Sequence, residues 1–195
     1  MDQRSRQPIG SGKPETLNCV GQKPTTGKSE FETTETDAFW MRRAIVLARA
    51  GETMPGGSPI GCVIVLDGQV VGEGYNEADL LCDPSAHAEI VAMRRAGQHL
   101  RSKELRDATL YTTLQPCGMC SMASIWAKIG RIVYGAGRGD VHEMYFEDRH
   151  MNTIDFIRDA FRDDISLQGG VLSQECASLY FAPDEDIPAE KQFNR

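Results

Sequence analysis

Apolar residues recur along the middle of the chain with two periods, one typical of helices and the other of strands. A helix is predicted over residues 38–50, because Thr36 or Asp37 can cap its first turn and apolar residues follow at helical spacing. Its apolar side is expected to comprise Phe39, Ile45, Val46 and Leu47. A Gly- and Pro-rich stretch at 54–59 then predicts a flexible connection to the first strand.

Short apolar runs bounded by turn residues predict five strands. They are expected at residues 60–66, 69–75, 109–113, 131–135 and 165–171. Asp67-Gly68 is a strong signal for a two-residue hairpin between the first two strands. Further helices are expected from about residue 86 and over 116–128, 151–162 and 173–180. Strands that alternate with helices after an opening hairpin predict an α/β protein, a three-layer α/β/α fold around one mixed five-stranded sheet.

Composition changes along the chain and divides it into three parts. Residues 1–35 are rich in Gly, Pro, Ser, Thr and Lys and lack an apolar period, so we expect a disordered N-terminal extension without catalytic residues. Residues 36–183 are enough for one domain with a sizeable core. Residues 184–195 are expected to form a loose acidic tail.

The overall composition predicts a cytoplasmic protein without membrane contact. Of the 195 residues, 41% are hydrophobic and 25% are charged, as in soluble globular proteins. No apolar run approaches the length of a membrane span, and the first residues lack the apolar centre of a signal peptide. Four cysteines are expected to be free thiols, namely Cys19, Cys62, Cys82 and Cys176. Cys62 and Cys176 are expected in the core.

The net charge of −7 bears on the partner of this protein. Residues 1–36 hold five basic and five acidic residues, so the negative excess lies in the folded part. Nucleic-acid-binding proteins usually carry a basic face, because phosphate contacts supply much of their affinity. Five basic residues could form a local patch, although a solvated helix face is the simpler interpretation: Arg94, Arg95, Arg101, Lys103 and Arg106. The charge therefore favours a small substrate over nucleic acid.

The candidate chemistry lies in two segments, His-Ala-Glu at 87–89 and Pro-Cys-Gly-Met-Cys at 116–120. A catalytic zinc ion takes three protein ligands and keeps its fourth position for water. His87, Cys117 and Cys120 can supply the three ligands, while Glu89 can move protons between that water and the substrate. Cys-x-x-Cys alone also marks redox and structural zinc motifs, so the prediction depends on the whole pattern.

Local structure decides whether His87 and Glu89 can act together. On a regular helix, side chains two residues apart diverge by about 200°. The two side chains converge on one water only if His87 lies at the helix entry and Glu89 just inside it. Pro116 can open a second helix, which places both cysteines in a first turn where the helix dipole favours thiolate. The alternative for Glu89 is a solvated carboxylate of the first turn.

The pattern His-x-Glu…Pro-Cys-x-x-Cys is the known signature of zinc nucleobase deaminases. From about residue 39 to residue 180 the chain resembles the cytidine/deoxycytidylate deaminase superfamily, with tRNA wobble-adenosine deaminases and bacterial guanine deaminases as the nearest branches. The similar segments are Phe-Trp-Met-Arg at 39–42, Gly-Glu-Gly-Tyr-Asn at 72–76, Asp-Pro-Ser-Ala-His-Ala-Glu at 83–89, Leu-Tyr-Thr-Thr-Leu at 110–114 and Gly-Val-Leu-Ser-Gln-Glu-Cys-Ala at 170–177. The resemblance implies Zn2+ as cofactor, a tight homodimer and hydrolytic deamination of a cyclic amidine with Glu89 as the catalytic proton carrier.

The resemblance also indicates substrate-binding residues. Asn76 matches the family's substrate-binding Asn after the second strand, and a simple turn residue is the alternative. The backbone N–H at Ala88 is expected to help orient the substrate. Trp126 falls where guanine deaminases carry an active-site Trp, and the alternative is a core or dimer-interface residue. Asp148 matches the acid that accepts paired N–H donors from guanine, and the alternative is an exposed loop carboxylate.

Three features depart from the nearest relatives. Gln115 stands where the family usually has Glu before Pro-Cys, so we expect tuned rather than lost activity. Residues 143–161 replace the Gly-Ser-Leu and His-Pro-Gly-Met-Asn-His segments of the tRNA branch. The C-terminal part does not resemble the helix that guanine deaminases exchange between subunits.

These observations support three hypotheses in a definite order. The first is a zinc-dependent hydrolase that deaminates a small nucleobase-like or nucleoside substrate, guanine first, and releases ammonia. The alternative is adenosine-to-inosine editing at the tRNA wobble position, which predicts a basic groove across the dimer. The third is a catalytically inactive, zinc-stabilised partner subunit, and the intact Glu89 argues against it.

Overall fold

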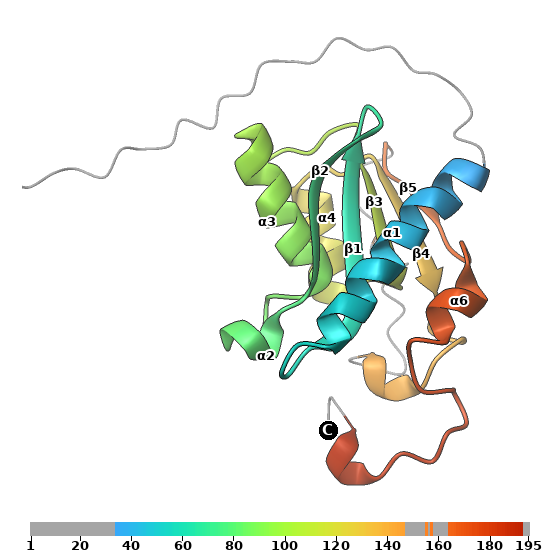
Figure 1. Cartoon of the computed structure of the whole chain (residues 1–195). Helices are drawn as coiled ribbons and strands as arrows, with labels where there is room; N and C mark the ends of the chain where they lie inside the picture. The colour runs from blue at the N-terminus through green and yellow to red at the C-terminus, as the bar shows by residue number, and fades with distance from the viewer. Residues whose placement is uncertain (1–33, 147–154, 156, 158–163, 193–195) are drawn as a thin grey trace, which may run out of the picture.

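The computed structural model describes residues 34–146, 155, 157 and 164–192. The helices are α1 (Thr34–Glu52), α2 (Ala78–Leu81), α3 (Ala88–Leu100), α4 (Gly118–Trp126) and α6 (Ser173–Ala177). The strands are β1 (Ser58–Leu66), β2 (Gln69–Asn76), β3 (Thr109–Leu114), β4 (Arg131–Ala136) and β5 (Ser166–Gln168). Two short 3-10 helices, η1 (Glu143–Tyr145) and η2 (Ala189–Lys191), lie in the C-terminal half (Figure 1).

The five strands form one mixed sheet in the order β2-β1-β3-β4-β5, which confirms the predicted fold class. β1 is antiparallel to both β2 and β3, while β4 is parallel to both β3 and β5. The predicted hairpin is present, with positive φ angles of 50° at Asp67 and 71° at Gly68. Two positive φ angles in succession are characteristic of a type I′ turn, whose twist matches that of the paired strands.

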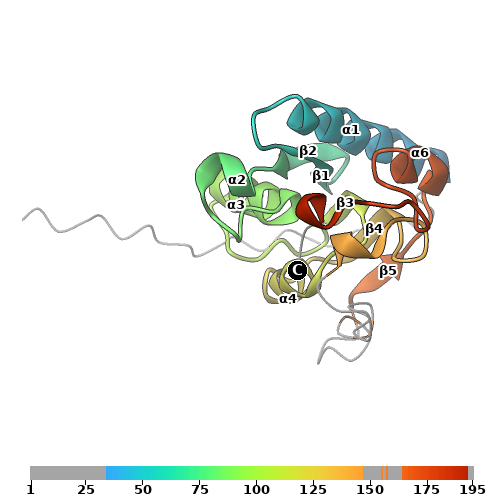
Figure 2. The ribbon, with the colours of Figure 1, turned by 90° about the horizontal axis from the view of Figure 1, so that it is seen from below.

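Helices cover both faces of the sheet (Figure 2). One buried cluster lies between the sheet and α1 and α6, and it includes Met41, Val63, Tyr111, Val133 and Cys176. The cluster on the opposite face, towards α3 and α4, includes Cys62, Ala92, Leu110, Ile132 and Met93. Cys62 and Cys176 are both fully buried, as the sequence predicts.

The buried side of α1 differs from the prediction. Phe39 and Val46 are 61% and 65% exposed, so their assignment to the apolar side is wrong. Ile45 is buried as predicted and Leu47 is half-buried, and the other buried residues of the helix are Asp37, Met41, Ala44, Ala48 and Gly51. These positions recur every three to four residues and form one stripe, which includes the polar Asp37 and the small Ala44 and Ala48. Side-chain hydrophobicity alone therefore misplaced Phe39 and Val46 but not Ile45.

The C-terminal segment is mostly exposed but has one buried residue. Ile187 is only 6% exposed, and its carbonyl oxygen accepts a hydrogen bond from Gln192 Nε2 at 2.6 Å. Both views place η2 beyond the carboxyl ends of β3 and β4 (Figures 1 and 2). The helix predicted over 151–162 lies outside the described residues except for Asp155 and Ile157, which are helical, and residues 1–33 lie outside them as well. No helix in the described part of the chain is both long and apolar enough to cross a membrane.

Candidate active site

The two motif segments each lie at the start of a helix. His87 is the N-cap of α3, with φ −64° and ψ 157°, and Glu89 is the second residue inside that helix. Cys117 is the N-cap of α4, with φ −71° and ψ 173°, and follows β3 after two residues. These positions satisfy the condition derived from the sequence, in which His87 enters the helix and Glu89 lies just inside it.

The three predicted ligands lie at distances that suit zinc. His87 Nδ1 is 3.6 Å from Cys117 Sγ and 3.8 Å from Cys120 Sγ, and all three ligand atoms lie within 4.8 Å of one another. Zinc bonds of about 2.3 Å to sulfur and 2.1 Å to nitrogen, at a tetrahedral angle, separate nitrogen from sulfur by about 3.6 Å. The one imidazole and two thiols therefore fit a zinc ion, with a fourth position for water.

The two cysteines have different proton affinities. A hydrogen bond from the Cys120 thiol, assisted by His87, lowers the pKa of Cys117 to about 4 against the opposing effect of burial. The same bond to Cys117, together with burial, raises the pKa of Cys120 well above its ordinary value. Without metal, the pair therefore holds one proton and one negative charge. This state is one proton away from the dithiolate that binds zinc.

Glu89 lies beside the ligands in a buried position. Its side chain is 4% exposed, and Oε2 is 3.5 Å from Cys120 Sγ. Burial raises the pKa of Glu89, the neighbouring Cys117 raises it further, and His87 opposes the shift. A carboxylate whose pKa is raised holds a proton more readily, as a group that takes a proton and returns it must. The solvated carboxylate considered from the sequence is not what the structure has.

A turn directly before His87 fixes the entry to α3. Asp83 Oδ1 accepts hydrogen bonds from the backbone N–H of Ser85 at 2.8 Å and from its hydroxyl at 2.6 Å. These bonds lower the pKa of Asp83. Arg94, two turns along α3, bonds to Asp83 Oδ2 at 3.1 Å and to Ser85 Oγ at 2.9 Å. Arg94 thus ties the turn directly before His87 to α3.

A second network, which the sequence did not indicate, lies beneath the site. Thr113 Oγ1 accepts from the backbone N–H of Gly61 at 3.1 Å and is 2.7 Å from the hydroxyl of Tyr180. Burial raises the pKa of Tyr180 well above its ordinary value. Thr113 is four residues before Cys117, so this bond joins the C-terminal segment to the strand that leads to the ligands. Only the tertiary contact identifies Tyr180, because nothing near it in sequence suggests a role.

Gln115 has a defined partner. It is 5% exposed, and its Oε1 accepts a hydrogen bond from the backbone N–H of Arg138 at 3.2 Å. The Arg138 guanidinium lies 4.4 Å from the centre of the Phe146 ring, within the range of a cation–π contact. Gln115 therefore joins the loop before Cys117 to the loop after β4.

Of the four expected substrate-binding residues, two lie at the ends of elements near the ligands and one lies far along α4. Asn76 is the last residue of β2, and its Oδ1 accepts from the backbone N–H of Ala78 at 3.3 Å. Ala88 is the first residue of α3, where a backbone N–H has no partner within the helix. Trp126, at the far end of α4 and about 13 Å along the helix from Cys117, is 69% exposed. A core role for Trp126 is therefore wrong, and a single chain does not bring it to the ligands. Asp148 lies outside the described residues.

The fold and the His/Cys/Cys/Glu arrangement are those of a zinc-dependent hydrolase. The family model for the cytidine and deoxycytidylate deaminase zinc-binding region matches residues 34–136. The chain belongs to this family and is a zinc-dependent deaminase.

Similar proteins include deaminases that act on two different purines. The tRNA-specific adenosine deaminase of Buchnera aphidicola (subspecies Baizongia pistaciae) is 38% identical over 163 residues, covering 82% of this chain and 96% of that protein. The guanine deaminase of Bacillus subtilis is 40% identical over 109 residues, covering 56% of this chain and 70% of that protein. A solved structure from work on A-to-I editing by tRNA:A34 deaminases has a TM-score of 0.62 at 33% identity, covering 72% of this chain and 98% of that chain.

Proposed function

We propose that this deaminase acts on a small purine-like base or nucleoside, with guanine as the first candidate, and releases ammonia. The purine ring is supported by the relatives, which are named for adenosine and for guanine. The preference for a small substrate is carried by the pairing of basic residues on the surface around α3. Three of the five residues that could form a basic patch are bound to carboxylates, namely Arg94, Arg95 and Arg106.

Paired arginines make a weak phosphate-binding surface. Arg94 Nη1 lies 3.1 Å from Asp83, and Arg95 Nη2 lies 2.7 Å from Glu77. A phosphate would have to compete with these carboxylates, in a protein whose net charge is already −7. A neutral ring meets no such competition.

The chain's own residues supply the steps of the proposed reaction. When bound, zinc acts as a Lewis acid that lowers the pKa of water towards about 7. Glu89 takes a proton from the attacking water and delivers it to the departing amino group. Asn76, whose Oδ1 is used by Ala78, offers its amide Nδ2 hydrogens to an acceptor on the ring. The backbone N–H at Ala88 orients the same ring at the start of α3.

Two further residues belong to this proposal, Asp148 as a test of ring preference and Trp126 as part of a subunit interface. Asp148 is proposed to accept paired N–H donors from guanine, so Asp148→Ala should raise the KM for guanine strongly. An unchanged substrate profile would remove Asp148 from the site. Trp126 is proposed to lie in a homodimer interface instead of binding substrate within its own chain.

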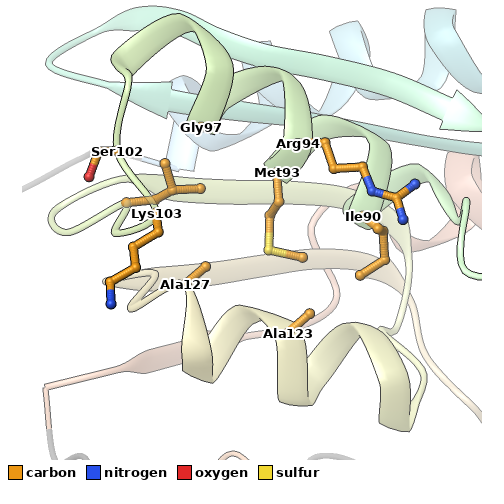
Figure 3. Close-up of a pocket in the computed structure, with 9 residues that line it drawn as sticks. Ile90, Met93, Arg94, Gly97, Ser102, Lys103, Ala123 and Ala127 are labelled. Atoms are coloured by element: carbon orange, nitrogen blue, oxygen red, sulfur yellow. The ribbon is translucent and has the colours of Figure 1, made fainter. Parts of the chain in front are cut away.

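The proposed dimer surface lies on α3 and α4. A groove of about 330 Å³ runs between these helices, with Ile90, Met93, Ala123 and Ala127 along it and Arg94 and Lys103 at its rim (Figure 3). The adjoining row of α4 exposes Met119, Met122 and Trp126. We propose that a second copy of this chain covers this surface, because the resemblance implies a homodimer and an exposed apolar row of this kind marks a protein interface. Trp126→Lys should shift the molecular mass by sedimentation from dimer to monomer.

A second candidate function is adenosine-to-inosine editing in tRNA. Its support is the extent of the similarity, since the Buchnera aphidicola tRNA-specific enzyme matches 82% of this chain and the Bacillus subtilis guanine deaminase 56%. In this case a base from a single-stranded loop would enter the same pocket.

The five cysteines of the described chain are unpaired, which supports a reducing compartment such as the cytoplasm for either substrate.

Two assays on the zinc-loaded protein separate these functions. The first measures ammonia release from guanine, adenine, cytosine, aminotriazines and the corresponding nucleosides. The second measures inosine formation in an anticodon stem-loop with adenosine at the wobble position. Turnover of a free base or nucleoside with a silent stem-loop is the expected result. Inosine formation with a silent panel would overturn the small-substrate proposal and favour tRNA editing.

A further inference from the structure

Glu77, which directly follows Asn76 at the end of β2, forms an ion pair with Arg95 of α3. Arg95 Nη2 lies 2.7 Å from Glu77 Oε1, and Arg95 Nη1 donates to the backbone oxygen of Glu73 at 2.9 Å. The Glu77 side chain is only 9% exposed, whereas that of Arg95 is 49% exposed. One guanidinium of α3 therefore contacts Glu73 within β2 and Glu77 directly after β2.

Glu77 also contacts the entry to α3 through its backbone. Its N–H donates to the carbonyl oxygen of Ala86 at 2.9 Å, one residue before the ligand His87. Its own carbonyl oxygen accepts from Leu81 N–H at 2.9 Å, which closes the short helix α2. Glu77 is thus in contact with three segments: the end of β2, α2 and the start of α3.

β2 packs closely against α3 beside the ion pair. A Cβ added to Gly74 would lie 2.6 Å from Val91 Cγ1 and 3.2 Å from Arg95 Nη1. Glycine is therefore required for β2 to lie directly against α3 at the level of the ion pair. The ion pair lies beside this contact, with the carboxylate buried and the guanidinium half-exposed.

We infer that the Glu77–Arg95 pair is a positioning device, which holds the Asn76 amide at a fixed place relative to His87 and Glu89. This inference rests on the proposed function, in which Asn76 binds the ring of the substrate. Glu77 itself donates nothing to the reaction. It acts through the residue directly before it in the chain, and the pair is 18 residues apart in sequence, so no local motif reveals it.

A double-mutant cycle tests whether Glu77 acts through Asn76. Glu77→Ala should retain zinc and raise the KM by about tenfold with little change in kcat, a coupling of ordinary size for residues in contact. Glu77→Gln, which keeps an oxygen for Arg95, should recover most of the loss. In an Asn76→Ala background, Glu77→Ala should raise the KM no further. Glu104→Ala is the matched control, because Glu104 pairs with Arg106 and Lys128 beyond the opposite end of α3.

The cycle uses whichever substrate of the panel wild-type protein turns over, so an error in the proposed ring does not decide the result. Additive effects of Glu77→Ala and Asn76→Ala on KM would overturn the inference. Hydrogen exchange provides a readout independent of turnover. Amides at residues 76–87 should exchange faster in Glu77→Ala than in wild type, and at the wild-type rate in Glu104→Ala. A wild-type rate in Glu77→Ala would also overturn the inference. If wild-type protein turns over no substrate of the panel, the proposed function is refuted. The exchange rates would still show whether the Glu77–Arg95 pair holds residues 76–87 in place.

Discussion

His87 Nδ1 lies 3.6 Å from Cys117 Sγ, although the two residues are 30 positions apart in the chain. Each is the N-cap of a helix, and the two helix starts meet at one end of the sheet. A metal site built from two helix starts places its ligands and Glu89 on backbone that is fixed by the sheet. This arrangement leads to five expectations about the chemistry and stability of the protein.

Glu89 should be essential for turnover and dispensable for the metal. Glu89→Gln keeps the size of the side chain but cannot accept the proton, so kcat should fall by about 10²- to 10⁴-fold. Zinc content, measured by atomic absorption, should be unchanged because Glu89 is not one of the three ligands. Loss of zinc from this variant would show that Glu89 has a structural role.

Without one of its cysteine ligands, the protein should no longer gain thermal stability from zinc. Wild-type protein should unfold at a higher temperature with zinc than after chelation, because a ligand that binds only the folded state stabilises it. Cys117→Ala and Cys120→Ala should bind no zinc and show no such difference. Cys82→Ala is the control, since Cys82 is exposed and outside the metal group. Either ligand variant with full zinc content would remove that cysteine from the set.

Cys117 should be reactive in metal-free protein even at mildly acidic pH. Its pKa of about 4 means that the thiolate is already formed at about pH 6, so alkylation should not accelerate between about pH 6 and pH 8. An ordinary thiol with a pKa of about 8.5 becomes about 75-fold more ionised over that range, and free glutathione serves as the reference. Mass spectrometry should find Cys117 protected when zinc is restored. A glutathione-like pH profile would contradict the assignment.

Gln115 should be replaceable by Glu but not by Leu. Gln115→Glu still accepts the hydrogen bond from Arg138 N–H, so the variant should fold, bind zinc and retain activity within about tenfold of wild type. Gln115→Leu removes the acceptor and should lower the free energy of unfolding by about 1–3 kcal/mol in urea titrations. Equal stability of the Leu variant would show that this bond does not hold the loop after β4.

Among the ion pairs of the described residues, that of Asp37 with Arg131 should cost the most stability when it is broken. Asp37 is 2% exposed, and its two carboxylate oxygens each lie 2.7 Å from a guanidinium nitrogen of Arg131. Arg131→Met leaves a buried charge without this partner and should lower the free energy of unfolding by about 3–5 kcal/mol. Arg43→Met is the matched control, because its pair with Glu73 is on the surface and should cost less than about 1 kcal/mol. Similar losses in the two variants would contradict the importance of burial.

Features set by short sequence separations could be predicted from the chain. The Asp67-Gly68 hairpin depends on two adjacent residues with positive φ. The observed strands begin and end within one residue of their predicted bounds, except at Ser58, where β1 begins, and in β5. The ligand set was also predictable, because Cys117 and Cys120 share one helical turn and His87 and Glu89 share one helix start. Spacing within a single turn fixes which side chains can converge.

Features that depend on distant partners were decided only by the tertiary structure. Phe39 and Val46 are as apolar as the residues that are buried, so only contact with the sheet reveals that α1 buries the stripe through Met41 and Ala44 instead. Trp126 likewise carries no sequence signal that distinguishes core from surface. Pairs such as Glu77 with Arg95, or Thr113 with Tyr180, join residues 18 and 67 positions apart. The sequence determined the chemistry of this site because its motifs are local, whereas the surroundings that hold and select a substrate come from packing between elements far apart in the chain.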